Sequence, residues 1–153
     1  MTYMRYSITP TFPVSTVQDR PTFELSSPID ILRYWRVHIA SDPTIEDYKE
    51  QLLVVAIDTR MNVIGHHIVS VGTVDQCLLF VRDVLRPVLV AGAKRFVLMH
   101  NHPSGDARPS SADITVTQKL VKACEVMDLK LYDHVIIGGV GRNYYSFLEH
   151  GRV

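Results

Sequence analysis

The feature that most constrains the fold of this chain is an apolar run from Leu52 to Asp58, LLVVAID. The run is partly β-branched and polar residues bound it on both sides, a pattern typical of a strand buried in a sheet. Residues 59–62 have the composition of a turn, and Val63–Val71 resembles a second strand. Because a short connection joins antiparallel neighbours, we expect these two strands to pair in that sense.

Helical and strand patterns alternate along the chain. A helix is expected after Ser27, because Ser27 can cap it, Pro28 suits the first helical position and Asp30 lies three residues beyond the cap. Further helices are predicted at Leu78–Ala91 and Ser111–Met127, and further strands at Lys94–His100, Leu131–Gly138 and Tyr144–Leu148. Pro87 removes a backbone hydrogen bond and should kink or split its helix. This order predicts an α/β fold, a sheet covered by helices.

The N-terminal residues 1–26 differ from the rest, since they contain three prolines and show no sustained periodicity. We predict an extended arm there, either with a short strand or as a tail along the surface. A length of 153 residues suits one globular domain, which we place at residues 27–153.

Composition narrows the class of protein. Apolar residues make up 46% and charged residues 21%, which is typical of a soluble folded chain. No apolar run is long enough to cross a bilayer, and the N-terminus lacks the apolar stretch of a signal peptide. Cys77 and Cys124 lie in apolar surroundings, so we expect buried free thiols and a cytoplasmic protein. The formal net charge of zero does not favour wholesale nucleic-acid binding, although a local basic patch stays open.

The segment with the clearest chemistry is HNHPSG, residues 100–105, followed by Ser110 and Asp113. Residues i and i+2 of an extended chain point to one face, so His100 and His102 can reach the same metal ion. Asp113, in the first turn of the next helix, can supply a third ligand. Two imidazoles and one carboxylate leave one tetrahedral position for water, as in catalytic zinc sites.

Spacing alone leaves a second interpretation open. Two histidines at a strand end are often surface residues, and Ser110-x-x-Asp113 is also the pattern of a helix capping box. Among the other histidines, His66 and His67 are adjacent on a strand, so they point to opposite faces and cannot chelate one ion together. One of them could line a cleft. For His134 we expect a structural hydrogen bond near the site.

The string HNHPSGDARPSSADITVT resembles the metal-binding segment of the JAMM (MPN+) metalloprotease superfamily. That family's pattern is H-x-H, seven residues, Ser, two residues and Asp, and residues 100–113 match it without departure. HNHPSG and the later DHVIIGG resemble the RadC-like branch, and the resemblance runs from about Ser27 to the C-terminus. It implies a JAMM/MPN-type, cytidine-deaminase-like fold, a mixed β-sheet flanked by helices.

The resemblance also implies an activity, hydrolysis of an amide bond in a protein or peptide substrate by zinc-activated water. The zinc ligands would be His100, His102 and Asp113. Glu50, just before the LLVVAID run, matches the family's general base, and Ser110 matches the serine that stabilises the oxyanion. Rival acids, Glu46 and Asp47, lie further from the apolar run.

Two departures from the RadC-like pattern bear on substrate preference. Residues 66–69 read HHIV where an acidic residue is usual, and Val81 stands where a proline precedes the Arg-acidic pair. Other classes of function stay open as well. Domains of this superfamily also serve as non-catalytic interaction modules, usually after losing metal ligands, and RadC-like proteins carry a DNA-repair name. The neutral charge and the Pro-containing arm, in place of the branch's helical N-terminal module, do not favour DNA binding. A homo-oligomer is possible, and a membrane partner is not expected.

Overall fold

The computed structural model describes residues 23–42, 48–72, 80–139 and 143–153. Within these residues a five-stranded sheet has the order β2-β1-β3-β4-β5. The strands are β1 (Gln51–Ile57), β2 (Val63–Val71), β3 (Arg95–His102), β4 (Lys130–Gly138) and β5 (Asn143–Ser146). The helices are α1 (Pro28–Tyr34) with its π-helical continuation η1 (Trp35–Ile39), α2 (Val81–Val90) and α3 (Ser111–Val126).

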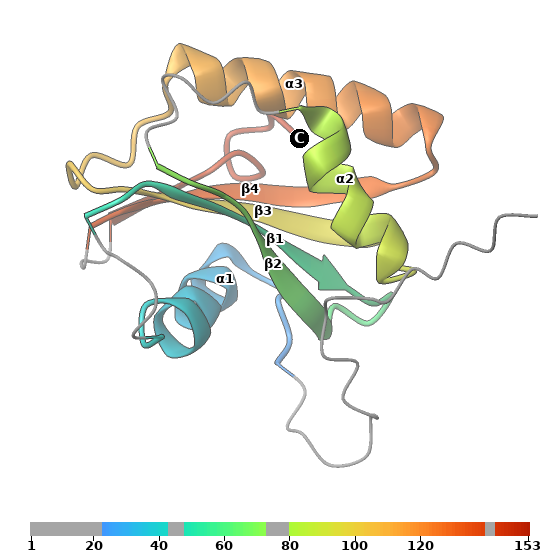
Figure 1. Ribbon diagram of the computed structural model, residues 1–153, viewed down its shortest axis with the longest axis horizontal. Coiled ribbons are helices and arrows are strands. Elements are labelled where there is room, and N and C mark those ends of the chain that lie inside the picture. Colours follow the sequence, from blue (N-terminus) through green and yellow to red (C-terminus); the bar gives the residue numbers. More distant parts are fainter. Residues whose placement is uncertain (1–22, 43–47, 73–79, 140–142) are drawn as a thin grey trace, which may run out of the picture.

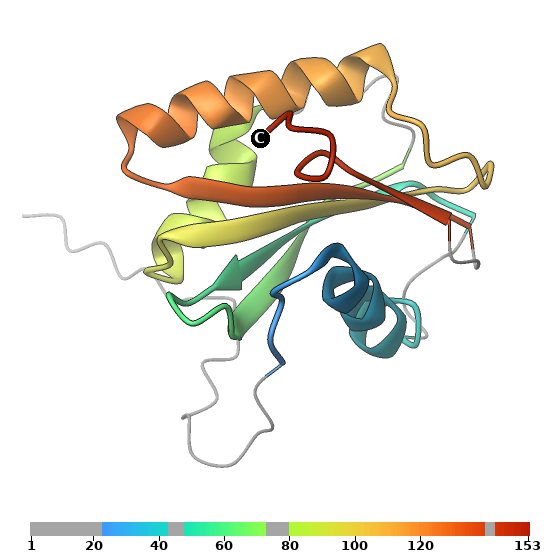
Figure 2. The ribbon, with the colours of Figure 1, turned by 180° about the vertical axis from the view of Figure 1, so that it is seen from behind.

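The sheet is mixed. β1 pairs antiparallel with β2 and β3, β3 pairs parallel with β4, and β5 pairs antiparallel with β4. Helix α3 connects the parallel strands β3 and β4, while α2 and α3 cover one face of the sheet and α1 covers the other (Figures 1 and 2). This is the α/β architecture expected from the sequence.

Strand β1 explains why its sequence is apolar at every position. All seven of its residues are buried. Leu53, Val55 and Ile57 pack into the cluster that contains α1. The alternate residues Leu52, Val54 and Ala56 pack into the cluster that contains α2 and α3. A strand covered on both faces loses the alternation of polar and apolar residues.

Two local sequence signals for helices had different outcomes in the structure. Ser27 caps α1 as predicted, and its Oγ accepts a hydrogen bond from the backbone N–H of Asp30 at 3.2 Å. Helix α2, by contrast, continues through Pro87 to Val90, so of the two effects predicted for this proline, a kink or a split, the split does not occur. Pro87 lies near the end of the helix, and only the carbonyl of Asp83 loses the partner that an N–H at position 87 would have supplied.

Residues 1–22 of the predicted arm lie outside the described residues, as does Cys77. The last part of the arm is extended: Glu24 forms a β-bridge with Asn62, and Leu25 is fully buried. Cys124 is a buried free thiol, as expected. Among the residues that the structure describes, no helix combines the length and apolarity needed to cross a membrane.

Candidate metal centre

The end of β3 presents two histidines on one face of the sheet. His100 pairs with Leu52 of β1 and with Ile136 of β4, and it is fully buried. His102 lies two residues further, with 16% of its side chain exposed. Both project toward the face that α3 covers, because Leu52, the partner of His100, belongs to the cluster that contains α3. Their Nε2 atoms lie 3.0 Å apart.

The first turn of α3 brings Asp113 to these histidines. The capping box expected from the sequence is present: Ser110 Oγ accepts from the N–H of Asp113, and Asp113 Oδ2 accepts from the N–H of Ser110 at 2.7 Å. The Ser110 hydroxyl also donates to Asp113 Oδ2 at 2.6 Å. Held in this way, Asp113 places Oδ1 3.2 Å from His100 Nε2 and Oδ2 3.6 Å from His102 Nε2.

Glu50 completes the group from the residue just before β1. Its Oε1 lies 3.8 Å from His100 Nε2 and 3.9 Å from His102 Nε2, and 18% of its side chain is exposed. Ligand atoms of Glu50, His100, His102 and Asp113 all lie within 4.8 Å of one another, a group that could hold a metal ion. The rival acids Glu46 and Asp47 lie outside the described residues.

Hydrogen bonds fix which nitrogen of His102 faces the centre. Its Nδ1 lies 2.7 Å from the backbone carbonyl of Asp106. A carbonyl only accepts, so Nδ1 carries the hydrogen and Nε2 keeps its lone pair. The lone pair of His102 Nε2 is therefore available to a metal.

A buried chain of hydrogen bonds fixes which nitrogen of His100 faces the centre. The Thr117 hydroxyl donates to the Asp113 carbonyl at 2.6 Å, so its oxygen must accept from His134 Nδ1, which lies 2.7 Å away. His134 Nε2 is then an acceptor, and His100 Nδ1 donates to it at 2.9 Å. His100 Nε2 keeps its lone pair as a result. The expected structural role of His134 near the site is confirmed.

A positive charge between these two lone pairs, which lie 3.0 Å apart beside two carboxylates, would stabilise the arrangement. In tetrahedral zinc sites with bonds of about 2.0–2.2 Å, ligand atoms lie roughly 3.3–3.6 Å apart. The separations among His100, His102 and Asp113 are 3.0, 3.2 and 3.6 Å, close to that geometry. Glu50 lies further from both histidines. The donor set therefore fits zinc with three protein ligands and a carboxylate beside them.

The ionisation of the group supports this description. Burial acts to raise the pKa of Asp113, but its contacts with the imidazoles of His100 and His102 and the hydrogen bond from Ser110 outweigh burial and hold the pKa well below its usual range. The contact with Asp113 raises the pKa of His102, against the effect of burial. Burial lowers the pKa of His134 far below its usual value, which keeps that imidazole neutral.

Other histidines named by the sequence lie elsewhere. His66 pairs with Val55 and His67 with Val54, so the two point to opposite faces as predicted. His66 Nδ1 lies 2.8 Å from the hydroxyl of Tyr34, on the α1 face. Neither histidine belongs to the metal-capable group.

Sequence reasoning missed three contributors. Thr117 lies one helical turn after Asp113, so its spacing was a usable signal. The Asp106 carbonyl is a backbone group, so the residue types of the sequence do not indicate its role. Gly138 permits the loop that carries Asp106 to pack on β4, because a Cβ there would lie 2.5 Å from the Gly105 carbonyl oxygen.

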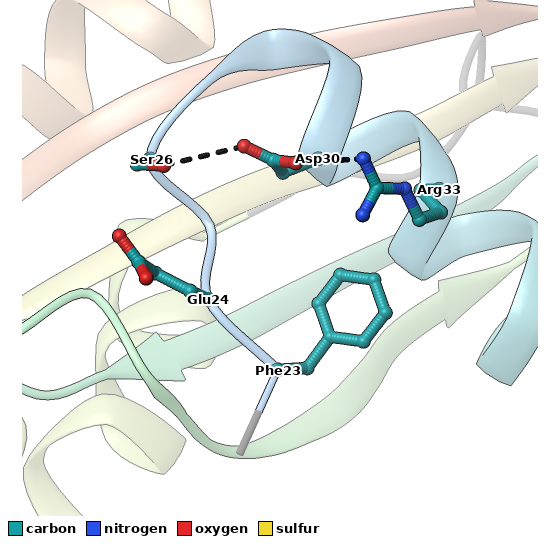
Figure 3. A pocket seen from close by; sticks show the side chains of 5 residues that line it. All are labelled: Phe23, Glu24, Ser26, Asp30 and Arg33. Atoms are coloured by element: carbon teal, nitrogen blue, oxygen red, sulfur yellow. Dashed lines mark hydrogen bonds and ion pairs between the residues drawn. The ribbon is translucent and has the colours of Figure 1, made fainter. Parts of the chain in front are cut away.

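A separate depression of about 280 Å³ lies beside α1 (Figure 3). It is lined by Phe23, Glu24, Ser26, Asp30 and Arg33. Asp30 accepts from Ser26 Oγ at 3.3 Å and pairs with Arg33 at 3.2 Å, so these polar groups satisfy one another. Since α1 covers the face opposite α3, this depression is separate from the candidate metal centre (Figures 1 and 2).

Comparison with known proteins finds one matching family model and several similar proteins. The sequence model of the RadC-like JAB domain matches residues 25–152. The chain is 38% identical over 121 residues to UPF0758 protein YkfG of Escherichia coli (strain K12), covering 78% of this chain and 72% of that protein. A UPF0758 protein of Thermotoga maritima is 42% identical over 105 residues, covering 69% of this chain and 46% of the relative. UPF0758 protein CT0611 of Chlorobaculum tepidum is 33% identical over 121 residues, 79% of this chain and 51% of the relative. The chain thus spans about half the length of the last two relatives.

Proposed function

Because this chain belongs to the RadC-like JAB domain family, we propose that it is a zinc-dependent hydrolase that cleaves an amide bond with metal-activated water. His100, His102 and Asp113 would hold the ion. When bound, zinc supplies a positive charge that lowers the pKa of a coordinated water to about 7 and polarises the substrate carbonyl. The substrate class would be a protein or peptide, with the scissile bond in the main chain or at a lysine side chain, and the site of action the cytoplasm.

The observation that carries this proposal is the orientation of the two imidazoles. The Asp106 carbonyl fixes one ring and the chain through His134 fixes the other, so both Nε2 lone pairs face one point at a mutual distance of 3.0 Å. Groups that orient a histidine in this way are characteristic of metal ligands.

Glu50 has the position of a general base. Its carboxylate lies 3.8–3.9 Å from the two histidine nitrogens, further from each than the carboxylate of Asp113. Its side chain is mostly buried, so it is partly desolvated. We assign Glu50 to accept the proton of the attacking water and to pass it to the leaving amine nitrogen.

Ser110 would donate to the oxyanion that develops on the substrate carbonyl. In the structure its hydroxyl donates instead to Asp113 Oδ2 at 2.6 Å. The oxyanion role therefore requires the hydroxyl to turn from Asp113 toward the substrate. The Ser110 N–H would remain on Asp113 Oδ2 and preserve the position of that carboxylate.

Metal analysis and one conservative variant test the proposal. Wild-type protein produced in zinc-replete medium should carry stoichiometric zinc, and His102→Ala should lose it. Glu50→Gln should keep zinc yet cleave a library of internally quenched peptides, including lysine-linked isopeptides, about 10²- to 10⁴-fold more slowly. Zinc-free wild type would contradict the metal site. Undiminished cleavage by Glu50→Gln would contradict the role of Glu50. A non-catalytic interaction module, the alternative from the sequence, would keep its biological effect in Glu50→Gln.

A further inference from the structure

Asn101 lies between the two histidines of β3, yet its side chain contacts neither of them in the hydrogen bonds that the structure shows. Asn101 Oδ1 accepts from the backbone N–H of Gln51 at 2.9 Å, and Asn101 Nδ2 donates to the backbone carbonyl of Lys49 at 3.0 Å. These two backbone groups belong to the residues on either side of Glu50. One buried amide, which is 8% exposed, therefore forms hydrogen bonds with the main chain on both sides of Glu50.

The orientation of this amide follows from its partners. A backbone N–H can only donate and a carbonyl can only accept, so the oxygen must face Gln51 and the nitrogen must face Lys49. Among side chains of this length, only asparagine supplies one donor and one acceptor in one plane. Aspartate has the same shape, but it would face the Lys49 carbonyl with a second oxygen.

These two hydrogen bonds lie just beyond the paired part of β1 and β3, on either side of Glu50. Backbone pairing between β1 and β3 ends at Leu52 and His100, two residues short of Glu50. Beyond that point, hydrogen bonds of the Asn101 side chain connect this segment to β3. On the other side, the N–H of Gly72 donates to the Glu50 carbonyl at 2.8 Å. The main chain around Glu50 is thus fixed from both neighbouring strands.

We propose that Asn101 is the positioning residue that holds Glu50 at the metal centre, an inference that rests on the proposed function. Asn101 ties the main chain on both sides of Glu50 to the strand that carries His100 and His102, so the base and the histidines keep a fixed relative position. Loss of this tie displaces the carboxylate and leaves the three metal ligands in place. Misplacement of a reacting group by about 1 Å can cost roughly a hundredfold in rate.

The test uses Asn101→Ala with Glu50→Gln and the double variant beside it. Asn101→Ala should bind zinc as wild type does in a chelator competition, and kcat should fall about tenfold to a hundredfold with KM unchanged. The double variant should be no slower than Glu50→Gln alone, because both changes act through one carboxylate. Hydrogen exchange should show faster exchange of the Gln51 amide in Asn101→Ala, a readout independent of activity.

Asn62→Ala is the matched control. Asn62 lies in the turn at the other end of β1, where its side chain donates to Asp58 at 3.0 Å. This variant should leave kcat and the Gln51 amide unchanged. If Asn101→Ala does not fold, Asn101→Asp preserves the side-chain volume and should also lower kcat.

The outcomes separate the two claims. Wild-type kcat in a folded Asn101 variant, or unchanged exchange of the Gln51 amide in Asn101→Ala, overturns the role of Asn101 while Glu50→Gln stays impaired. Undiminished activity of Glu50→Gln overturns the proposed function itself. A double variant much slower than Glu50→Gln shows that Asn101 acts through another group and also overturns the inference.

Discussion

The Thr117 side chain decides which nitrogen His100 offers to a metal. Its hydroxyl contacts both the Asp113 carbonyl and His134 Nδ1, and His134 in turn orients His100. Thr117→Val removes the hydroxyl with little change in shape, so His134 loses the acceptor that fixes its tautomer. We expect zinc affinity to fall about 10- to 100-fold, measured by competition with a chromophoric chelator.

Thr115→Val is a matched control for that change. Thr115 lies on the same helix and donates to the Ser111 carbonyl at 2.8 Å, but it is exposed and contacts no histidine. Its substitution should leave zinc affinity unchanged. Equal affinities of the two variants would contradict the orienting role of Thr117.

Asp133, which precedes His134 on β4, should make the free energy of unfolding depend on pH. It is fully buried, accepts from Ser146 Oγ and from the Leu148 N–H, and burial raises its pKa to about 6 from 3.8. The folded state therefore holds this proton more tightly than the unfolded state. The stabilisation is complete below about pH 4 and is lost as the pH rises through 6. The difference between a pKa of 3.8 and one of about 6 corresponds to roughly 3 kcal/mol of stability.

Asp133→Asn mimics the protonated carboxyl and should remove this contribution. In urea denaturation across pH 4 to 7, the free energy of unfolding of wild type should fall more steeply than that of the variant. Asp83→Asn, at a partly exposed carboxylate of α2, should keep the wild-type slope. Parallel curves for wild type and Asp133→Asn would refute the prediction.

At the scale of single residues, the sequence was informative where chemistry depends on side chains at fixed spacing. Spacing made His100, His102 and Asp113 candidates and the family resemblance favoured them as ligands. The structure places them together with Glu50. The partner of His102 could not be predicted, because the Asp106 carbonyl is common to every residue type. The contacts of Asn101 were also hidden, since they join segments about fifty residues apart.

Among the secondary-structure elements, the start of α3 combines a structural and a chemical role. Ser110 caps the helix and donates to Asp113 Oδ2 at 2.6 Å. Ser110→Ala should lower the free energy of unfolding by about 1 kcal/mol through the lost cap. It should also weaken zinc binding, because Asp113 loses a hydrogen bond that orients it. Chemical denaturation and chelator competition measure the two effects.

Ser27→Ala provides the comparison for that prediction. Ser27 caps α1 with the same pattern, donating to Asp30 Oδ2 at 2.6 Å and accepting from the Asp30 N–H. Its loss should cost similar stability with no effect on zinc. If both variants bind zinc equally well, the capping box of α3 serves the helix alone.

Periodicity located the helices better than it described their geometry. The sequence predicts one helix after Ser27, and the apolar residues Ile31, Trp35 and Ile39 of that segment are buried. The second half is nevertheless a π-helix, in which the Ala40 N–H donates to the Trp35 carbonyl at 2.8 Å. A change from four-residue to five-residue spacing depends on tertiary packing, which a helical stripe does not encode.

Across the whole molecule, the candidate metal centre lies where three elements meet: the start of β1, the end of β3 and the start of α3. The apolar run of β1 indicated a strand buried between helices, and the short turn indicated its pairing with β2. Local sequence does not determine the order β2-β1-β3-β4-β5, because β1 pairs with β3 across a long separation in the chain. The family resemblance implied a mixed sheet flanked by helices, but the strand order itself was not predicted.

The central claim is that this meeting point binds zinc with water beside Glu50. A crystal structure of the zinc-loaded protein, with anomalous diffraction recorded at the zinc edge, tests it most directly. One strong peak is expected about 2.0–2.2 Å from His100 Nε2, His102 Nε2 and a carboxylate oxygen of Asp113, with a bound water in hydrogen-bond reach of Glu50. A peak at other residues, or no peak between the two histidines, would contradict it.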